Sequence, residues 1–292
     1  MKIAIGIPAF NEEENIAAIL IKLKKISQHI IVCDDGSNDL TSEIAKQLGA
    51  IVVRHEKNLG YGAAIKTIFT KAQEINADIL TTFDADGQHR IEDVEKVLSP
   101  IKNNVADIVI GSRFLDNNQN IPKYRKIGIK AITRLTNITG GTKITDSQSG
   151  FRAYSKKILE NIKPTESGMG ISTEILIKTQ KAGYKITEVP ITVLYEGDTS
   201  THNPISHGSS VIFSTIKYVA IERPLTFYGI PGVIFLCIGI FFSVWALQIF
   251  SQERELVTNI VLVGGGGIIL GTVLMITATI LHSIISVVRE KR

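Results

Sequence analysis

Two long uncharged segments near the C-terminal end place the strongest restriction on how this chain can fold. Residues 228–250 contain no Asp, Glu, Lys or Arg, and neither do residues 256–288. Each segment exceeds the roughly 20 residues that a helix needs to cross the hydrocarbon core of a bilayer. The pattern predicts a hairpin of two transmembrane helices, about residues 228–250 and 257–286, joined by a short polar link. The alternative is a pair of buried core helices, which are seldom apolar all round over such lengths.

The basic residues that flank the two segments predict their orientation. Lys217 and Arg223 precede the first segment, and Arg289, Lys291 and Arg292 follow the second, whereas the link holds a single Arg. Cytoplasmic flanks are the ones enriched in Lys and Arg. The first ten residues also lack the long apolar region of a signal peptide. We therefore expect a multi-pass protein of the cell membrane, with the large N-terminal domain and both termini in the cytoplasm.

Strand-like and helix-like patterns alternate in the N-terminal part. Apolar runs typical of strands begin at Ile3, Ile30, Ile51, Ile79 and Ile108, and the segments between them have the apolar spacing of helices. This alternation predicts an α/β domain with a mostly parallel sheet and helices on both faces. Ligands of such sheets bind just beyond the carboxyl ends of the strands. The polar clusters of the sequence follow the expected strands, so we expect the functional site at that edge.

Helical spacing returns at residues 123–139, where Lys126, Lys130 and Arg134 recur every four residues. This basic stripe is either a solvated helix face or a contact with lipid headgroups or a phosphate-bearing substrate. Apolar positions before the first uncharged segment suggest an interfacial amphipathic helix. The expected organisation is a domain over residues 1–207, the interfacial helix over residues 208–226, and the membrane hairpin over residues 227–292.

Two carboxylates follow the fourth expected strand. Asp84 and Asp86 are one residue apart, and Gln88 comes shortly after them. Carboxylate and amide oxygens are ligands that Mg²⁺ and Mn²⁺ prefer, usually together with phosphate oxygens. A solvated turn could have the same residues. The acidic pair Asp34-Asp35 at the end of the second strand favours a site, because carboxylates at a pocket rim accept hydrogen bonds from nucleobase N–H or ribose hydroxyl groups.

Composition and motifs argue against several other functions. The net charge is only +4, and no dense block of Lys and Arg marks a nucleic-acid-binding surface. Cys33 and Cys237 are too few for a disulfide framework or a cysteine zinc site. The chain has no Gly-x-Gly-x-x-Gly or Walker A motif, which disfavours dehydrogenase and P-loop chemistry. His89, His202 and His207 are isolated in polar stretches, and we do not expect them to bind zinc.

Four short clusters together indicate a family. They are Pro8-Ala9-Phe10-Asn11-Glu12, Asp34-Asp35-Gly36-Ser37, Asp84-Ala85-Asp86 with Gly111-Ser112-Arg113-Phe114, and Asp146-Ser147-Gln148-Ser149-Gly150-Phe151-Arg152. In this order they closely resemble family 2 glycosyltransferases of the GT-A fold, in the branch of dolichyl-phosphate mannose and glucose synthases. The resemblance covers nearly all of residues 1–195, and the hairpin resembles that of membrane-anchored members. It implies a Rossmann-like GT-A catalytic domain with a mostly parallel sheet, followed by the two-helix transmembrane hairpin.

The resemblance implies a role for each cluster. The implied metal ligands are Asp84, Asp86 and Gln88, which would hold Mg²⁺ or Mn²⁺ on the donor diphosphate. The implied catalytic residues are Asp86, Arg113 and Asp146. The residues implied for donor binding are Pro8, Ala9, Phe10, Glu12, Cys33, Asp35, Asp84, Ala85, Asp86 and Arg113. The residues implied for acceptor binding are Arg113, Arg125, Ser149 and Arg152.

The implied reaction moves a sugar from a nucleotide-sugar donor to dolichyl or polyprenyl phosphate at the cytoplasmic face, with inversion, and supplies lipid-linked sugar for protein glycosylation or envelope glycans. The second pKa of a phosphate monoester is near ~6, so the acceptor needs no strong general base. The metal and Arg113 would bring two anionic groups together. The implied partners are the nucleotide sugar, the lipid phosphate and the bilayer, without nucleic acid. The sequence leaves open whether the protein forms a homo-oligomer through the transmembrane helices.

One departure from the family pattern bears on the donor. Mannose synthases of this family carry an Arg and a Lys after the strand that ends in Glu188-Val189-Pro190, and residues 195–208 contain neither. His202 or His207 would have to replace them. The loop is more similar to that of archaeal-type synthases that use UDP-sugars, so a UDP-sugar is favoured and GDP-mannose remains an alternative. Two other interpretations remain open, a processive polysaccharide synthase and a non-enzymatic membrane scaffold of the same fold.

Overall fold

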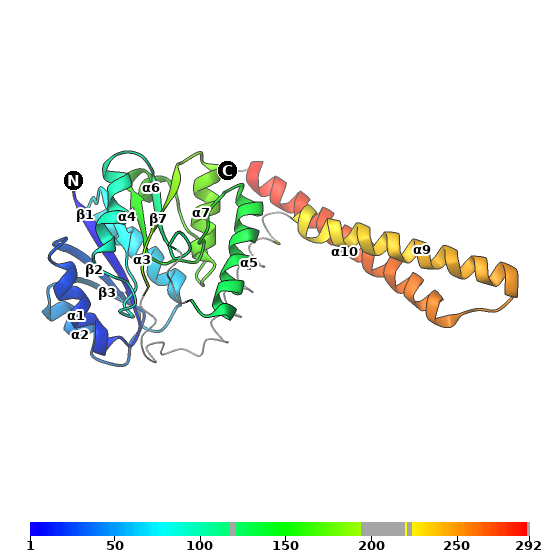
Figure 1. Cartoon of the computed structure of the whole chain (residues 1–292), viewed down its shortest axis with the longest axis horizontal. Coiled ribbons are helices and arrows are strands. Elements are labelled where there is room, and N and C mark those ends of the chain that lie inside the picture. The colour runs from blue at the N-terminus through cyan, green and yellow to red at the C-terminus, as the bar shows by residue number, and fades with distance from the viewer. Residues whose placement is uncertain (117–120, 194–219, 221–223, 291–292) are drawn as a thin grey trace. The chain divides into compact units, whose positions relative to one another are not determined.

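The computed structural model describes residues 1–116, 121–193, 220 and 224–290. It contains two compact units, Met1–Thr215 and Ile216–Arg292. The first is an α/β domain and the second a pair of long helices (Figure 1). The residues outside the described ranges include His202, His207 and most of the predicted interfacial helix.

The first unit is built on one sheet whose strands are β1 (Ile3–Ala9), β2 (His29–Asp34), β3 (Ile51–Arg54), β4 (Ile79–Thr82), β5 (Ile108–Ser112), β6 (Arg152–Ser155) and β7 (Ile186–Pro190). The seven strands lie in the order β3-β2-β1-β4-β6-β5-β7. β6 runs antiparallel to both of its neighbours, and the other pairs are parallel. The mostly parallel sheet that the alternating patterns predict is thus confirmed.

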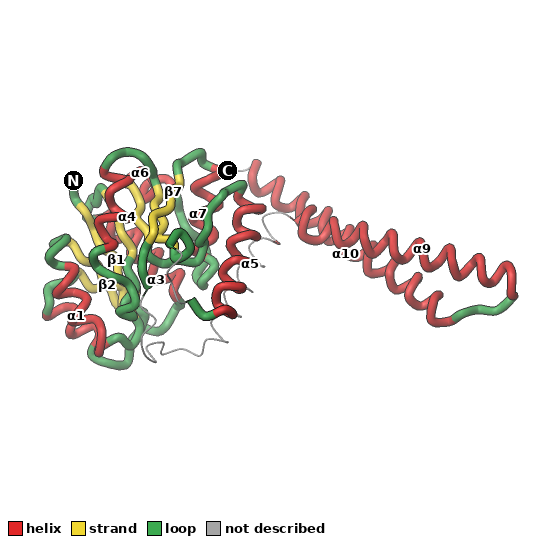
Figure 2. Tube along the Cα trace, viewed as in Figure 1, coloured by secondary structure: helices red, strands yellow, loops and turns green. Residues whose placement is uncertain are grey.

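The helices of this unit are α1 (Glu13–Leu23), α2 (Thr41–Gln47), α3 (Tyr61–Glu74), α4 (Asp93–Lys102), α5 (Lys123–Gly140), α6 (Lys156–Asn161) and α7 (Ile171–Lys181). Figure 2 shows helices on both sides of the strands. Successive strand residues point to opposite faces of a sheet. In β2, Ile30 and Val32 pack with residues of α1, α2 and α4, whereas Ile31 and Cys33 pack with residues of α3, α6 and α7. Both faces are buried, which explains why the central strands read as continuous apolar runs.

The five strands that the apolar runs predict are all present, but β6 has no counterpart in the sequence prediction. Its sequence, Arg-Ala-Tyr-Ser, is not an apolar run. Ala153 of β6 pairs with Thr81 of β4 on one side and with Val109 of β5 on the other. Such pairing between distant segments decides the strand, and local propensity does not reveal it.

The second unit contains η1 (Leu225–Gly229) and α9 (Ile230–Glu253), which are continuous, and α10 (Thr258–Glu290). Both long helices are apolar enough to cross a membrane. They pack closely at Gly239, where an added methyl group would lie 2.9 Å from the carbonyl oxygen of Gly264 and 2.8 Å from the carbonyl carbon of Gly267. Small residues that let two helices approach in this way are typical of helix pairs in membranes.

Candidate active site

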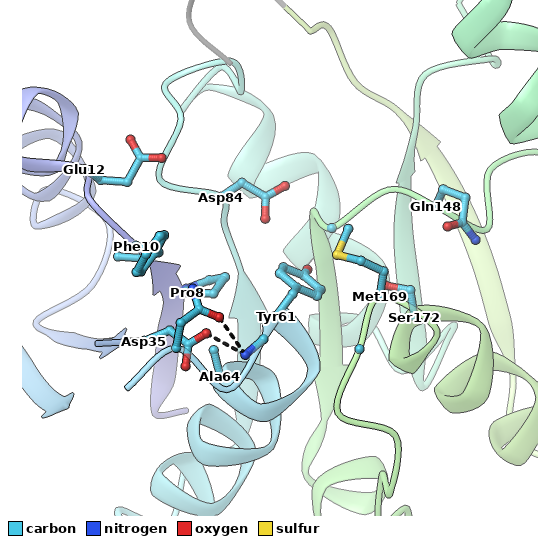
Figure 3. Close-up of a pocket in the computed structure, with 15 residues that line it drawn as sticks. Pro8, Phe10, Glu12, Asp35, Tyr61, Ala64, Asp84, Gln148, Met169 and Ser172 are labelled. Carbon is cyan, nitrogen blue, oxygen red and sulfur yellow. Dashed lines mark hydrogen bonds between the residues drawn. The ribbon is translucent and has the colours of Figure 1, made fainter. Parts of the chain in front are cut away.

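A cavity of about 490 Å³ opens at the carboxyl ends of β1 and β4. β1 pairs with β2 on one side and with β4 on the other, so the strand order reverses here, and a crevice forms at such a point. The loop after β1, the start of α3 and the residues around the start of α7 form its walls (Figure 3). Six residues predicted to bind the donor line it: Pro8, Ala9, Phe10, Glu12, Asp35 and Asp84.

Two of the remaining lining residues, Gln148 and Gly150, belong to the cluster at residues 146–152 that resembles the family, and the others come from two segments without a predicted role in the site. One is the glycine-containing stretch that begins α3, and the other surrounds the start of α7. A glycine-rich stretch directly before a helix was the available signal for the first, while the second has no distinctive motif. The residues are Asn58, Gly60, Tyr61 and Ala64 in the first segment, and Gly168, Met169 and Ser172 in the second.

The turn after β1 presents Phe10 and Glu12 to the cavity. Asn11 between them has a φ of 54°, a left-handed conformation that Asn tolerates better than most residues. Its backbone N–H donates to Ser37 Oγ at 2.9 Å, and its Oδ1 accepts from the backbone N–H of Asn38 at 2.9 Å. The turn is therefore tied to the loop that follows β2, which limits how the two cavity side chains can move.

Asp35, directly after β2, is a buried junction in the cavity wall. Its Oδ1 accepts from the backbone N–H of Leu59 at 2.9 Å and lies 2.6 Å from Nδ1 of His55, while its Oδ2 accepts from the N–H of Gly60 at 2.8 Å. On the other side of the ring, His55 Nε2 lies 2.9 Å from Thr67 Oγ1. Asp35 thereby fixes the loop that begins α3. Sequence reasoning missed His55, because the fold alone brings it next to Asp35.

The Asp84 carboxylate lies in the cavity beside Tyr61 and Gly150 (Figure 3). A methyl group on Gly150 would lie 2.6 Å from Asp84 Oδ2 and 2.9 Å from the Tyr61 hydroxyl oxygen. Asp84 Oδ2 is also 3.2 Å from Nε2 of His89, whose side chain is buried against Phe83. The position of Asp84 therefore depends on the absence of a side chain at Gly150.

Three carboxylates repel one another at this end of the sheet. Burial raises the pKa of Asp86, and the negative charge of Asp84 raises it further, although the Gln88 backbone N–H donates to Asp86 Oδ1 at 3.0 Å. Burial likewise raises the pKa of Glu12 from 4.5 to about 7, with smaller contributions from Asp86, Asp39 and Asp84. The site thus concentrates negative charge that is unfavourable in the metal-free protein.

This arrangement suits a divalent cation that also takes ligands from a substrate. Within the described ranges, no group of three or more His, Cys, Asp or Glu side chains is placed to hold a metal by itself. Mg²⁺ usually binds one or two protein carboxylates together with substrate phosphates and water. A cation between Asp84 and Asp86 would remove their mutual repulsion, so the residues fit this mode of binding.

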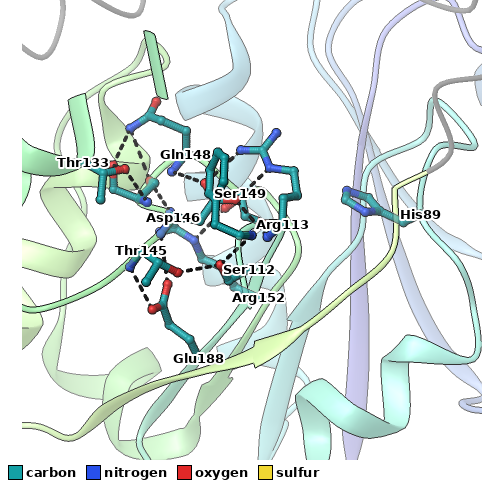
Figure 4. Close-up of polar contacts among 12 residues, drawn as sticks. His89, Ser112, Arg113, Thr133, Thr145, Asp146, Gln148, Ser149, Arg152 and Glu188 are labelled. Atoms are coloured by element: carbon teal, nitrogen blue, oxygen red, sulfur yellow. Dashed lines mark hydrogen bonds and ion pairs between the residues drawn. The ribbon is translucent and has the colours of Figure 1, made fainter. Parts of the chain in front are cut away.

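Arg113, which is half-buried, forms an ion pair with the fully buried Asp146 (Figure 4). Nε and Nη2 of Arg113 donate to Asp146 Oδ2 at 2.7 Å and to Oδ1 at 2.9 Å. Burial alone would raise the pKa of Asp146, but the charge and hydrogen bonds of Arg113 more than offset burial and hold this pKa below its ordinary value. Glu188 supports the same loop, because it accepts from the backbone N–H groups of Thr145 at 2.8 Å and Asp146 at 3.0 Å.

Arg152, predicted to contact the acceptor, has a different role in the structure. Its side chain is buried, and its guanidinium donates to the backbone carbonyls of Ser147, Ser149 and Ser172 at 2.7 to 2.8 Å. Ser149, also predicted to bind the acceptor, is buried as well. Arg152 therefore supports the loop that carries Gln148 to the cavity, and its charge is not offered to a ligand.

Seven further predicted residues are not among those that line the cavity, namely Cys33, Ala85, Asp86, Gln88, Arg113, Arg125 and Asp146. Cys33 is fully buried in the core on one face of the sheet, and burial, with the Asp35 charge, raises the pKa of its thiol to about 12. Its Sγ lies 3.6 Å from His55 Nε2, so it neighbours the site only through that ring. Arg125 lies half-buried in the first turn of α5.

We expect the Glu12 carboxyl to destabilise the metal-free protein as the pH rises from about 4.5 to 7. A carboxyl whose pKa is higher in the folded state holds its proton more tightly there, so stability falls as that proton is lost. A pKa change from 4.5 to about 7 corresponds to about 3 kcal/mol, which partial solvent access reduces to about 1–2 kcal/mol. Thermal unfolding of the wild type and of Glu12→Gln from pH 4.5 to 8 measures this effect.

The Glu12→Gln variant should gain stability relative to the wild type as the pH rises, by an amount that levels off above pH ~7. Glu14→Gln on the exposed face of α1 is the matched control and should follow the wild type. Parallel pH profiles for Glu12→Gln and the wild type would contradict the raised pKa.

Comparison with known proteins identifies the family. Residues 4–163, more than half of the chain, match glycosyl transferase family 2. A UDP-N-acetylglucosamine–dolichyl-phosphate N-acetylglucosaminyltransferase of Methanococcus voltae is 36% identical over 228 residues, which are 70% of this chain and 89% of that protein. A dolichyl-phosphate hexose transferase of Haloferax volcanii is 31% identical over 223 residues, which are 76% of this chain and 95% of that protein.

A solved structure supports the fold. Glucosyl-3-phosphoglycerate synthase from Mycobacterium tuberculosis, in complex with Mn²⁺, UDP and phosphoglyceric acid, matches with a TM-score of 0.57 and 19% identity, covering 75% of this chain and 78% of that chain. The expected fold, a GT-A domain with a mostly parallel sheet, is confirmed together with the two apolar C-terminal helices. The chain therefore belongs to glycosyltransferase family 2.

Proposed function

We propose that this glycosyltransferase moves a sugar from a nucleotide-sugar donor to dolichyl or polyprenyl phosphate at the cytoplasmic face of a membrane. The observation that carries the proposal is the cavity into which Glu12, Asp35 and Asp84 converge, in a chain with two helices long enough to cross a bilayer. The two relatives are both named for dolichyl phosphate but for different sugars. They support this acceptor more strongly than any one sugar.

The two ends of the cavity suggest how the donor lies. Phe10 and Asp35 lie toward one end, and Met169 and Gln148 toward the other (Figure 3). We assign the nucleoside to the first end, where Phe10 offers a ring face and Asp35 a hydrogen-bond acceptor. A UDP-sugar is favoured because residues 195–208 lack Arg and Lys, and because the Methanococcus relative is named for a UDP-sugar.

Asp84 and Asp86, with Gln88 beside them, would hold Mg²⁺ or Mn²⁺ on the donor diphosphate. The bound cation would neutralise charge on the departing diphosphate. Other residues of the chain hold these two carboxylates in position. The Gln88 backbone N–H orients Asp86, and the missing side chain at Gly150 leaves room for the Asp84 carboxylate. The Mn²⁺ and UDP bound to the structurally similar synthase are consistent with this assignment.

The acceptor phosphate needs orientation more than activation, because its second pKa near ~6 leaves it largely dianionic at neutral pH. One of its oxygens would bond to the anomeric carbon while the bond from that carbon to the diphosphate oxygen breaks. The electron pair of that bond leaves with the nucleoside diphosphate, and attack from the opposite side inverts the configuration. Arg113, oriented by Asp146, would attract the acceptor phosphate.

We expect Gly150→Ala to weaken Mn²⁺-dependent UDP binding at least about tenfold, as is typical when the support of a metal ligand is disturbed. The added methyl group would meet both oxygens of Asp84, at 2.6 and 2.7 Å, and displace that carboxylate. Isothermal titration calorimetry measures the change. Gly128→Ala in α5 is the matched control, since a methyl group there meets no atom within 4 Å. Unchanged UDP binding by Gly150→Ala would remove Asp84 from the proposed site.

The proposed function is tested with a panel of donors. Full-length protein in nanodiscs is incubated with dolichyl phosphate, Mn²⁺ and labelled UDP-glucose, UDP-N-acetylglucosamine or GDP-mannose, and the glycolipid is separated by chromatography. We expect product with a UDP-sugar. Product with GDP-mannose alone would overturn the donor assignment. A folded protein that forms no glycolipid with any donor would overturn the proposal as a whole.

A further inference from the structure

Asp35 lines the cavity, and neighbouring residues already donate nearly all of the hydrogen bonds that its carboxylate can accept. An ionised carboxylate has four lone-pair directions, two on each oxygen. Oδ1 takes the N–H of Leu59 at 2.9 Å and Nδ1 of His55 at 2.6 Å, so both of its directions are occupied. Oδ2 takes the N–H of Gly60 at 2.8 Å. Counting the residues that the structure describes, Asp35 can accept one further hydrogen bond, at Oδ2, from a molecule in the cavity.

The side chain of His55 determines how many further hydrogen bonds Asp35 can accept. An ionised carboxylate only accepts, so Nδ1 of His55 must donate to it. The opposite ring nitrogen, Nε2, lies 2.9 Å from Thr67 Oγ1 and 3.6 Å from Cys33 Sγ. The side chain of His55 is only 11% exposed. The contacts of Nε2 with Thr67 of α3 and Cys33 of β2, together with this burial, therefore hold the ring against Asp35.

We propose that His55 is a positioning residue that sets the nucleobase specificity of the donor site, an inference that rests on the nucleotide-sugar function proposed above. By occupying Oδ1 of Asp35, His55 leaves a single acceptor for the base. Uracil presents one N–H on its pairing edge, at N3, flanked by two carbonyl groups. One acceptor at Oδ2 satisfies that donor completely, so the count on Asp35 matches uracil.

Guanine presents a different pattern. Its N1–H and its N2 amino group are adjacent donors, and a carboxylate pairs with both only by using both oxygens. With Oδ1 of Asp35 already occupied by His55, one guanine donor would enter the cavity without a partner. An unpaired buried donor lowers affinity by about ten- to a hundredfold. His55 would thus favour uridine diphosphate over guanosine diphosphate without touching either base.

The first test uses the wild-type, full-length protein with Mn²⁺ and three ligands in calorimetry, namely UDP, GDP and N3-methyl-UDP. We expect UDP to bind about ten- to a hundredfold more tightly than GDP, and N3-methyl-UDP to bind at least about tenfold more weakly than UDP because it lacks the donor. GDP or N3-methyl-UDP binding as tightly as UDP would overturn the inference. If none of the three binds to folded protein, the proposed function fails, and this inference fails with it.

The second test changes His55 itself. His55→Phe keeps the ring volume but removes the donor to Asp35, so the ratio of UDP to GDP affinity should fall about tenfold. Thr67→Val removes only the contact at Nε2 and should lower the ratio less. His29→Phe makes the same change at the opposite end of β2 and should leave the ratio unaltered.

A merely structural role for His55 predicts a different result. In that case His55→Phe would weaken UDP and GDP equally and leave their ratio unchanged, which would overturn the inference. Calorimetric unfolding of each variant shows whether it is folded. Should His55→Phe fail to fold, the Thr67→Val ratio and the wild-type comparison of UDP with N3-methyl-UDP still decide the question.

Discussion

Asp86→Asn is expected to lower sugar transfer at least about a hundredfold, as loss of a charged group that stabilises the transition state does, and yet to raise the melting temperature of the metal-free protein. The two effects have one cause. Burial and the neighbouring charge of Asp84 raise the pKa of Asp86, so the ionised carboxylate is unfavourable in the folded protein. Asn has no charge to repel Asp84, and for the same reason it would offer the proposed cation a weaker ligand.

Thermal unfolding with and without Mn²⁺ and UDP measures both effects. At a ligand concentration about a hundredfold above its Kd, the wild type should gain about 2.7 kcal/mol of stability, and Asp86→Asn should gain little. Asp78→Asn, just before β4 and at its other end, is the matched control and should respond to the ligands like the wild type. Full activity in Asp86→Asn would refute the metal assignment.

Arg113→Met is expected to lower the free energy of unfolding by about 3–5 kcal/mol at pH 8, because it leaves the buried carboxylate of Asp146 without its charged partner. In the wild type the lowered pKa of Asp146 contributes stability above the ordinary carboxyl pKa, and this contribution is lost only as the pH falls through the folded value. In the variant, burial acts without Arg113 and raises that pKa. The loss of stability should therefore shrink as the pH falls from 8 toward 5.

Calorimetry of the full-length protein at pH 8 and pH 5 measures this dependence. The only Trp, Trp245, lies in α9, so its fluorescence does not report on the catalytic unit. Lys102→Met, which breaks the surface pair with Glu95, is the control and should cost less than about 1 kcal/mol at either pH. An equal loss at both pH values for Arg113→Met would point to lost packing, and the ionic explanation would fail.

Arg113 and Asp146 show how much of the site can be predicted from the sequence. Arg113 follows β5 and Asp146 belongs to the loop before β6, and both carry motifs that resemble a known family. Their direct pairing, at 2.7 Å between Nε and Oδ2, depends on a contact between positions 33 residues apart. The motifs therefore predicted that both residues belong to the functional site, whereas the structure showed that each residue holds the other in position.

Arg152 and β6 show what local pattern misses. A basic residue in a polar motif suggested a ligand contact, but three backbone carbonyls hold its guanidinium in the interior. The antiparallel strand that begins with Arg152 is inserted between β4 and β5. That insertion, together with the bond from Thr82 Oγ1 to the Gly150 carbonyl at 2.6 Å, brings Gly150 against Asp84.

Local periodicity and the points where strands stop were enough to predict the alternating strands and helices, the two apolar helices and the placement of Asp35 and Asp84 at strand ends. In contrast, the acceptor directions of Asp35 that remain for a ligand follow only from the packing of the folded domain. His55 lies 20 residues from Asp35 in the chain and Gly60 lies 25 residues away, and both reach the carboxylate only after the sheet and α3 have packed. The number of hydrogen bonds that a side chain can still accept depends on the residues that surround it in space, and the local sequence pattern does not show which residues these are.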